Sequence, residues 1–209
     1  MRITFLTKGT RPGEGRGPFP YFFPLFLSLQ VLAFFLFPVE SAAQKPERAD
    51  LSLFDRLAEE ATLLNKRGKF DEVVSLLEPH KGNPKNDSAL FFNELGVSYR
   101  NKNKLDESIQ AYRRALSLDP ENPVVMKNLA DAFFLKKEYS QAVEMCQKAL
   151  KSNPRFHQVR STLGLAYYRL GKFPEALEEF EAVLKLNPQD EQARNFREAI
   201  RKKLQNQKK

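Results

Sequence analysis

Few residues of this chain have the types and spacings that catalysis or metal binding requires. The two histidines, His80 and His157, stand far apart, and neither is paired with a glutamate in a zinc-binding motif. Cys146 is the single cysteine, so the chain can form neither an internal disulfide nor a cysteine metal cage. The sequence also has no glycine-rich phosphate loop and no nucleophile elbow. We therefore expect no catalytic residue, no metal site, no cofactor and no small-molecule substrate, and a protein that is not an enzyme.

The densest group of acidic side chains has a structural interpretation. The glutamates between positions 175 and 181 alternate with apolar residues such as Ala176, Leu177 and Phe180. Apolar residues at this spacing form one face of a helix. The glutamates are therefore the solvated side of an amphipathic helix rather than a carboxylate pair for acid–base catalysis.

Three consecutive blocks of 34 residues, 89–122, 123–156 and 157–190, repeat one pattern. The seventh and eighth places hold leucine and a small residue: Leu95–Gly96, Leu129–Ala130 and Leu163–Gly164. The eleventh place is aromatic: Tyr99, Phe133 and Tyr167. The twentieth place is small again, as Ser108, Ala142 and Ala176, and the thirty-second is proline, as Pro120, Pro154 and Pro188. A fixed period of this length is the sequence signature of stacked repeats.

Each block predicts two helices joined by a short polar turn. Leu95, Gly96 and Tyr99 share one helical face, since residues three and four apart lie above one another. Asn103 and Gly171 stand at equivalent places in the turn, and both tolerate the left-handed conformation that ends a helix. The second helix ends at the residue before each proline, which is pushed out of helical geometry. Small residues at the eighth and twentieth places let the two helices approach closely, and the aromatic residue at the eleventh fills the gap.

This pattern resembles the tetratricopeptide repeat (TPR). The residues of the third block that match the TPR motif closely are Leu163, Gly164, Tyr167, Ala176, Phe180 and Pro188. The resemblance implies an all-α fold, a right-handed superhelical α-solenoid of helical hairpins. Three residues depart from the motif. Arg160 replaces the bulky apolar residue usual at the fourth place, and Ser108 and Cys146 are weaker matches at two other packing places.

Weaker versions of the pattern flank the three blocks. Residues 51–88 predict a degenerate first repeat, in which Glu60 stands at the seventh place and Pro79 cuts the second helix short. Residues 191–209 predict a capping helix that solvates the last hairpin, followed by a basic tail.

The chain before the repeats has the composition of a targeting segment. Basic residues precede an apolar run, Tyr21–Val39, and the small residues Ser41 and Ala43 follow it. We predict that residues 1–43 are a cleaved export signal and that residues 44–50 are a polar linker. The uninterrupted part of the run is shorter than the roughly 20 residues of a spanning helix, which favours cleavage over the alternative, a retained N-terminal membrane anchor. In either case the repeats would be exported across the cytoplasmic membrane, to the periplasm or the medium if the source is bacterial.

The net charge of +8 lies mainly at the ends of the chain. Residues 44–193 contain 23 basic and 23 acidic side chains, whereas residues 194–209 contain seven basic and one acidic. A repeat protein that binds nucleic acid would carry a basic stripe through its repeats, so this distribution argues against a nucleic-acid partner.

The resemblance to TPR proteins also indicates a binding surface, because the first helix of each hairpin lines a concave groove. The partner-binding candidates at groove positions are Asn93, Arg100, Lys127, Asp131, Phe134, Tyr168 and Arg169. The donors among them could hold a peptide backbone or carboxylate, and aromatic residues and arginine often dominate interface energies. The alternative for Phe134 and Tyr168 is that they pack against neighbouring hairpins.

Members of the family that bind chaperone tails hold a C-terminal carboxylate with lysine and asparagine at five groove places. Those places are occupied here by Asn93, Val97, Asn128, Gln158 and Thr162. Only Asn128 matches, so we do not expect this chain to bind that tail. We expect instead a non-enzymatic interaction module that docks a peptide or helix of a protein partner in its groove. The alternatives are a structural or assembly factor that uses its convex face or basic tail, and a membrane contact through the N-terminal apolar segment.

Overall fold

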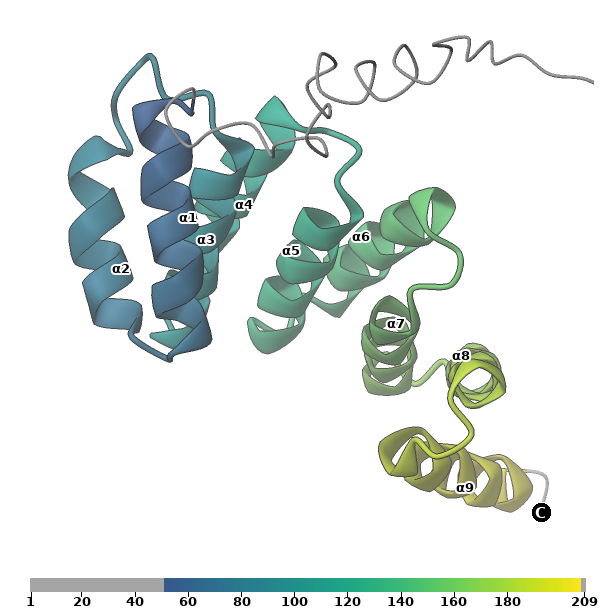
Figure 1. The fold of residues 1–209 in the computed structure, drawn as a ribbon. Coiled ribbons are helices and arrows are strands. Elements are labelled where there is room, and N and C mark those ends of the chain that lie inside the picture. Colours follow the sequence, from purple (N-terminus) through teal and green to yellow (C-terminus); the bar gives the residue numbers. More distant parts are fainter. Residues whose placement is uncertain (1–50, 208–209) are drawn as a thin grey trace, which may run out of the picture. The chain divides into compact units, whose positions relative to one another are not determined.

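The computed structural model describes residues 51–207, which belong to one compact unit. The predicted export signal or anchor, the linker 44–50 and the last two residues of the basic tail lie outside the described residues. Every regular element within 51–207 is a helix, and the helices follow one another along a stack in chain order (Figure 1). The predicted fold class, an all-α solenoid of helical hairpins, is confirmed.

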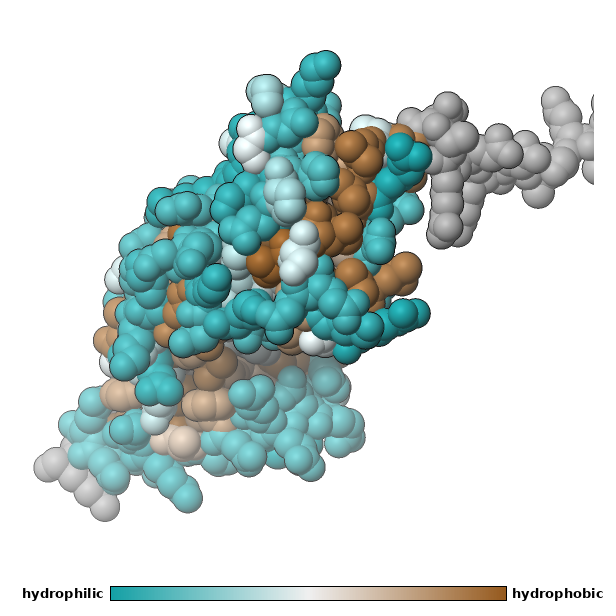
Figure 2. Space-filling view, turned by 90° about the vertical axis from the view of Figure 1, so that its left-hand side faces the viewer, coloured by the Kyte–Doolittle hydropathy of each residue, from teal (hydrophilic) through white to brown (hydrophobic). Residues whose placement is uncertain are grey.

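The helices pair into four hairpins and a final single helix. Their bounds are α1 Leu53–Lys66, α2 Phe70–Leu77, α3 Ala89–Asn101, α4 Leu105–Leu118, α5 Pro123–Leu135, α6 Tyr139–Ser152, α7 His157–Arg169, α8 Phe173–Leu186 and α9 Glu191–Asn206, with a short 3-10 helix η2 at Glu78–His80. The helices α3, α5 and α7 begin at the first residues of the three 34-residue blocks. Within the first hairpin, α2 has eight residues where α4, α6 and α8 have 14, because the chain turns at Pro79. Figure 2 faces the side of the stack on which this first hairpin lies.

The helix ends follow the predicted chemistry. The residues before the repeat prolines, Asp119, Asn153 and Asn187, have φ of −135°, −138° and −137° with ψ between 83° and 90°, so each leaves the helical region and ends its helix. The next first helix then begins under a side-chain cap where one is available: Asn122 accepts from the backbone N–H groups of Val124 and Val125.

The turns inside the hairpins share one left-handed residue. Asn103 and Gly171 have φ of 58° and 74°, and the equivalent residues Gly68 and Lys137 have 73° and 66°. The left-handed prediction for Asn103 and Gly171 is confirmed. Lys137 shows that the turn geometry is imposed even on a residue for which it is unfavourable.

The two helices of a hairpin meet where the eighth residue of the block faces the twenty-fourth. A Cβ atom added to Gly96 would lie 2.6 Å from the ring of Tyr112, and one added to Gly164 would lie 3.1 Å from the ring of Phe180. In the middle block the eighth place holds the larger Ala130 instead of glycine, and the twenty-fourth holds the smaller Cys146 instead of an aromatic residue. The aromatic ring that fills this gap is therefore at the twenty-fourth place, and not at the eleventh place as the sequence suggested.

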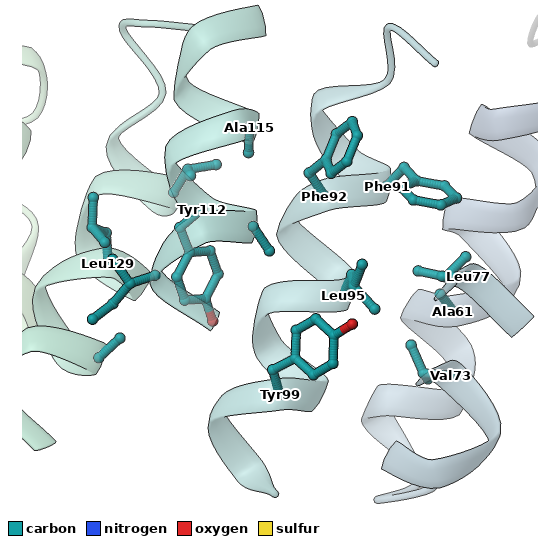
Figure 3. Close-up of a cluster of buried hydrophobic side chains, with 14 of the residues drawn as sticks. Ala61, Val73, Leu77, Phe91, Phe92, Leu95, Tyr99, Tyr112, Ala115 and Leu129 are labelled. Carbon is teal, nitrogen blue, oxygen red and sulfur yellow. The ribbon is translucent and has the colours of Figure 1, made fainter. Parts of the chain in front are cut away.

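Figure 3 shows the core around the first of these contacts. The ring of Tyr112 lies between Leu129 of α5 and the α3 side chains Leu95 and Tyr99, and all four side chains are buried. This cluster takes side chains from several successive hairpins, so neighbouring hairpins share a core, and two further clusters follow towards α9.

The departures from the TPR motif each have a local cause. Arg160 donates from Nη1 to the Glu179 carboxylate at 2.8 Å and from Nη2 to the Pro154 carbonyl at 3.1 Å, so a part-buried ion pair replaces an apolar contact. Burial raises the pKa of Glu179, and the hydrogen bond from Arg160 opposes that rise. Ser108 donates to the Gly96 carbonyl at 2.8 Å, and Cys146 is fully buried, as its place in the repeat predicts.

The last helix, α9, closes the C-terminal end of the stack. Phe196 stacks on Phe180 with ring centroids 5.1 Å apart, and Ile200 is fully buried. The exposed side of α9 is polar, which gives the last hairpin a solvated cover.

The two tight glycines give a stability prediction. Gly96→Ala should lower the free energy of unfolding by about 1–3 kcal/mol, because its methyl group overlaps the rigid ring of Tyr112. Gly164→Ala is the matched control and should change it by less than about 1 kcal/mol, since a 3.1 Å contact needs only a small shift and alanine favours the helix. Urea unfolding measures both, and equal effects at the two positions would contradict this account of the hairpin contact.

Candidate functional site

The first helices of successive hairpins are joined by hydrogen bonds along one side of the stack, which we call the inner face. Between α1 and α3, Asn65 Nδ2 donates to the Glu94 carboxylate at 2.7 Å and to the Glu94 carbonyl at 3.0 Å. Ser98 donates to Asn65 Oδ1 at 2.6 Å. Glu94 also accepts from Asn93, which in turn accepts from Asn128 of α5 at 2.9 Å. These bonds form a continuous polar chain across three helices.

A second group of bonds on the inner face has Asp131 at its centre. Its carboxylate accepts from Arg100 of α3 at 3.3 Å, from Lys127 of α5 at 2.8 Å and from Thr162 of α7 at 2.9 Å. The side chains of Arg100, Lys127 and Asp131 are only 19%, 25% and 23% exposed. Two cations and one anion leave this cluster with one positive charge, and each cation already has a partner.

Four of the predicted site residues take part in these two groups of bonds. Asn93, Arg100, Lys127 and Asp131 all lie on the inner face, as their places in the repeat imply. Asn93, Arg100 and Asp131 bond to residues of a neighbouring hairpin, whereas Lys127 bonds to Asp131 of its own helix. The sequence pattern did not predict the other residues of these hydrogen bonds, which are Asn65, Glu94, Ser98, Asn128 and Thr162. These partners could have been found from the sequence, because the bonded polar residues lie 29 to 35 positions apart, about one repeat.

The two predicted aromatic anchors are partly buried by the chain itself. Tyr168 packs edge-on against Phe173 and Phe196, with ring centroids 5.6 Å from each, and the Lys203 ammonium lies 5.8 Å from its centroid. Phe134 packs against Tyr139 at 5.4 Å. Packing within the stack thus accounts for Tyr168, which lies under the capping helix. Arg169, by contrast, is exposed.

An apolar cavity of about 350 Å³ opens on the inner face between the amino-terminal halves of α3 and α5. Its lining residues are Ala89, Leu90, Asn93, Asp119, Asn122, Val124 and Val125. Leu90 and Val124 occupy the second, inward place of their blocks and are 42% and 50% exposed. Unlike the cluster around Asp131, this cavity has exposed apolar surface next to polar groups. We call it the inner pocket.

A second cavity, of about 410 Å³, lies on the opposite side of the stack, between α4 and α6. Leu116, Leu129, Phe133 and Met145 form its apolar part. Charged and polar side chains surround them: Arg113, Ser117, Gln141, Glu144 and Lys148. We call it the outer pocket, and it is the feature that a partner on the convex face would use.

Neither pocket is equipped for covalent chemistry. Residues 51–207 contain no group of three or more metal-ligating side chains. Burial raises the pKa of the Cys146 thiol, which keeps it protonated and unreactive. Within the same residues, no helix has the length and apolar content needed to span a bilayer. The described pockets offer apolar contacts and hydrogen-bonding groups, which are means of binding.

Comparison with known proteins agrees with this description. Residues 84–194 match the family described as the cytochrome c-type biogenesis protein H TPR domain. Among solved structures, the first TPR domain of Spaghetti (RPAP3) bound to the HSP90 peptide SRMEEVD is 34% identical with a TM-score of 0.55, over 56% of this chain and 92% of that one. A structure of MamA AMB-1 is 24% identical with a TM-score of 0.65, over 71% of this chain and 87% of that one, which is a likeness of fold alone.

Curated relatives match over a shorter stretch. RNA polymerase II-associated protein 3 of Rattus norvegicus and that of Mus musculus are each 39% identical to this chain over 51 residues. The match covers 24% of this chain and only 8% of either relative, so most of those proteins has no counterpart here.

The polar chain between α1 and α3 gives a second prediction. Asn65→Ala should lower the free energy of unfolding by about 1–3 kcal/mol, because the part-buried Glu94 carboxylate loses its shorter hydrogen bond. Asn101→Ala is the control, since the amide of Asn101 donates only to the Val97 carbonyl of its own helix and is exposed. Hydrogen exchange should show the first hairpin opening earlier in Asn65→Ala. Unchanged protection of α1 would mean that this bond does not couple the hairpins.

Proposed function

The chain belongs to the tetratricopeptide-repeat family described as the cytochrome c-type biogenesis protein H TPR domain, and we propose that it is a non-enzymatic module that docks an extended segment of a protein partner on its inner face. The observation that carries the proposal is the inner pocket, where Leu90 and Val124 leave apolar surface uncovered between two helices joined by side-chain hydrogen bonds. The solved RPAP3 domain, whose title names a bound peptide, supports a peptide as the kind of partner.

The chemistry of the inner face favours an apolar anchor over a carboxylate. A cavity of about 350 Å³ has room for a large apolar side chain and part of its backbone. The inner-face cations Arg100 and Lys127 are both bonded to Asp131 and would have to give up that bond to hold a carboxylate. Asn128, the one residue that matches the chaperone-tail pattern, is buried and donates to Asn93. We propose that the bound segment inserts a leucine, isoleucine or phenylalanine into the inner pocket.

We further propose that the module acts outside the cytoplasmic membrane. The support is the basic–apolar–small pattern of residues 1–43, which has the order of an export signal. Mass spectrometry of the protein purified from its native cell tests this: a chain that begins near Gln44 is expected, and an intact Met1 in a cytosolic fraction would refute it.

A second candidate function has an observation of its own. The outer pocket is the larger of the two cavities and has a mixed charged rim, so an assembly factor acting through the convex face would use it. A role of the basic tail is harder to test by deletion. Helix α9 contributes Phe196 and Ile200 to the core, and its removal would uncover Phe180 and so also affect folding.

Paired variants distinguish the two surfaces. Leu90→Asp with Val124→Asp should weaken partner capture at least about tenfold, because two charges would enter the apolar pocket while the exposed backbone positions tolerate them. Leu186→Asp, at a 45% exposed leucine away from both pockets, is the control. Capture from a native extract by the full chain, quantified by mass spectrometry, measures the effect. Arg113→Glu with Lys148→Glu tests the outer pocket, and loss of the same partners in that variant alone would refute the inner-face proposal.

A further inference from the structure

Each second helix covers the first helix of the next hairpin: α2 packs on α3, α4 on α5, α6 on α7 and α8 on α9. The leucines at the seventh place of the covered helices, Leu95, Leu129 and Leu163, are 1%, 3% and 2% exposed. No helix precedes α1 among residues 51–207, so α1 has no such cover there. At the seventh place of α1 stands the exposed Glu60.

The uncovered side of α1 is an apolar stripe with one charge in its middle. Leu53, Leu57, Glu60 and Leu64 recur at helical spacing and therefore share one face, which we call the α1 end face. Leu53 is 49% exposed, and Leu57 and Leu64 are each partly exposed where their counterparts in α3, Phe92 and Tyr99, are buried. Figure 2 looks at this end of the stack and shows hydrophobic residues gathered on it.

Glu60 has no ion-pair partner within residues 51–207, although the nearby acids Asp71 and Glu72 are paired with Lys102 and Lys69. A carboxylate on the same helical face as three leucines would be costly to cover with another apolar surface, because it would lose water without gaining a partner. A cover that brings a cation to Glu60 removes this cost. A partner that covers the α1 end face therefore needs a positive charge as well as an apolar surface.

We propose that the α1 end face binds an amphipathic helix of a partner protein, with a lysine or arginine in its apolar stripe opposite Glu60. The helix would take the place that α4 takes on α5, where Leu116 lines a cavity together with Leu129 at the seventh place. Symmetric pairing of two copies through this face is disfavoured, because each copy would bring Glu60 and neither would bring a cation on the stripe.

A peptide built from this chain provides the probe. A labelled synthetic peptide of residues 104–120, which contains α4, carries Leu116→Lys so that it presents a cation where α4 presents leucine to α5. We expect it to bind the full chain at least about tenfold more tightly than the unaltered peptide in fluorescence anisotropy. Glu60→Lys in the full chain should abolish that preference, and the matched Glu59→Lys, one residue away on another side of α1, should preserve it.

The reversed charge pair tests the contact directly. A peptide with Leu116→Glu should bind the Glu60→Lys chain better than the wild-type chain, and the milder Glu60→Gln serves if Glu60→Lys lowers the melting temperature. Equal binding of the lysine peptide to the wild-type and Glu60→Gln chains would overturn the proposal. So would sedimentation equilibrium that shows wild-type oligomers dissolved by Glu60→Gln, since a second copy would then occupy the face.

Discussion

The contact on which the structure depends is the close approach of the two helices within a hairpin. Gly96 lies against the ring of Tyr112 and Gly164 against that of Phe180, with no room for a larger residue in the first case. A smaller partner, Cys146, allows alanine at the same place in the middle block. The size of the residue at the eighth place thus varies inversely with that at the twenty-fourth, as dense packing at one contact requires.

Uniform hairpins stack in register, and this stacking creates the inner face. Polar residues one repeat apart come within hydrogen-bond distance, so that Asn93 meets Asn128 and Asp131 joins Arg100 to Thr162. These bonds satisfy groups that would be costly to bury alone. They also leave the surface with little polar bonding capacity to spare. The inner pocket, by contrast, leaves the apolar side chains of Leu90 and Val124 exposed.

The two ends of the stack differ in how the outermost helix is covered. At the C-terminal end α9 supplies Phe196 to cover Phe180 and turns a polar side to water. At the other end α1 has Leu57 and Leu64 at the fourth and eleventh places but carries Glu60 where the covered helices carry leucine. One end is closed by the chain itself, whereas the described part of the other end exposes a face suited to a charged helix.

The sequence by itself determined the repeat register, the helix ends at the prolines and the left-handed turn at Asn103. These features depend on residues close together in the chain, whose geometry is set by local sterics and by helical periodicity. Only the tertiary structure decided that Asp131 bonds to Arg100 and Thr162, that Tyr168 lies under α9, and that Leu90 and Val124 border a cavity. Those outcomes depend on distances between side chains of different helices, which the periodicity of a single helix does not specify.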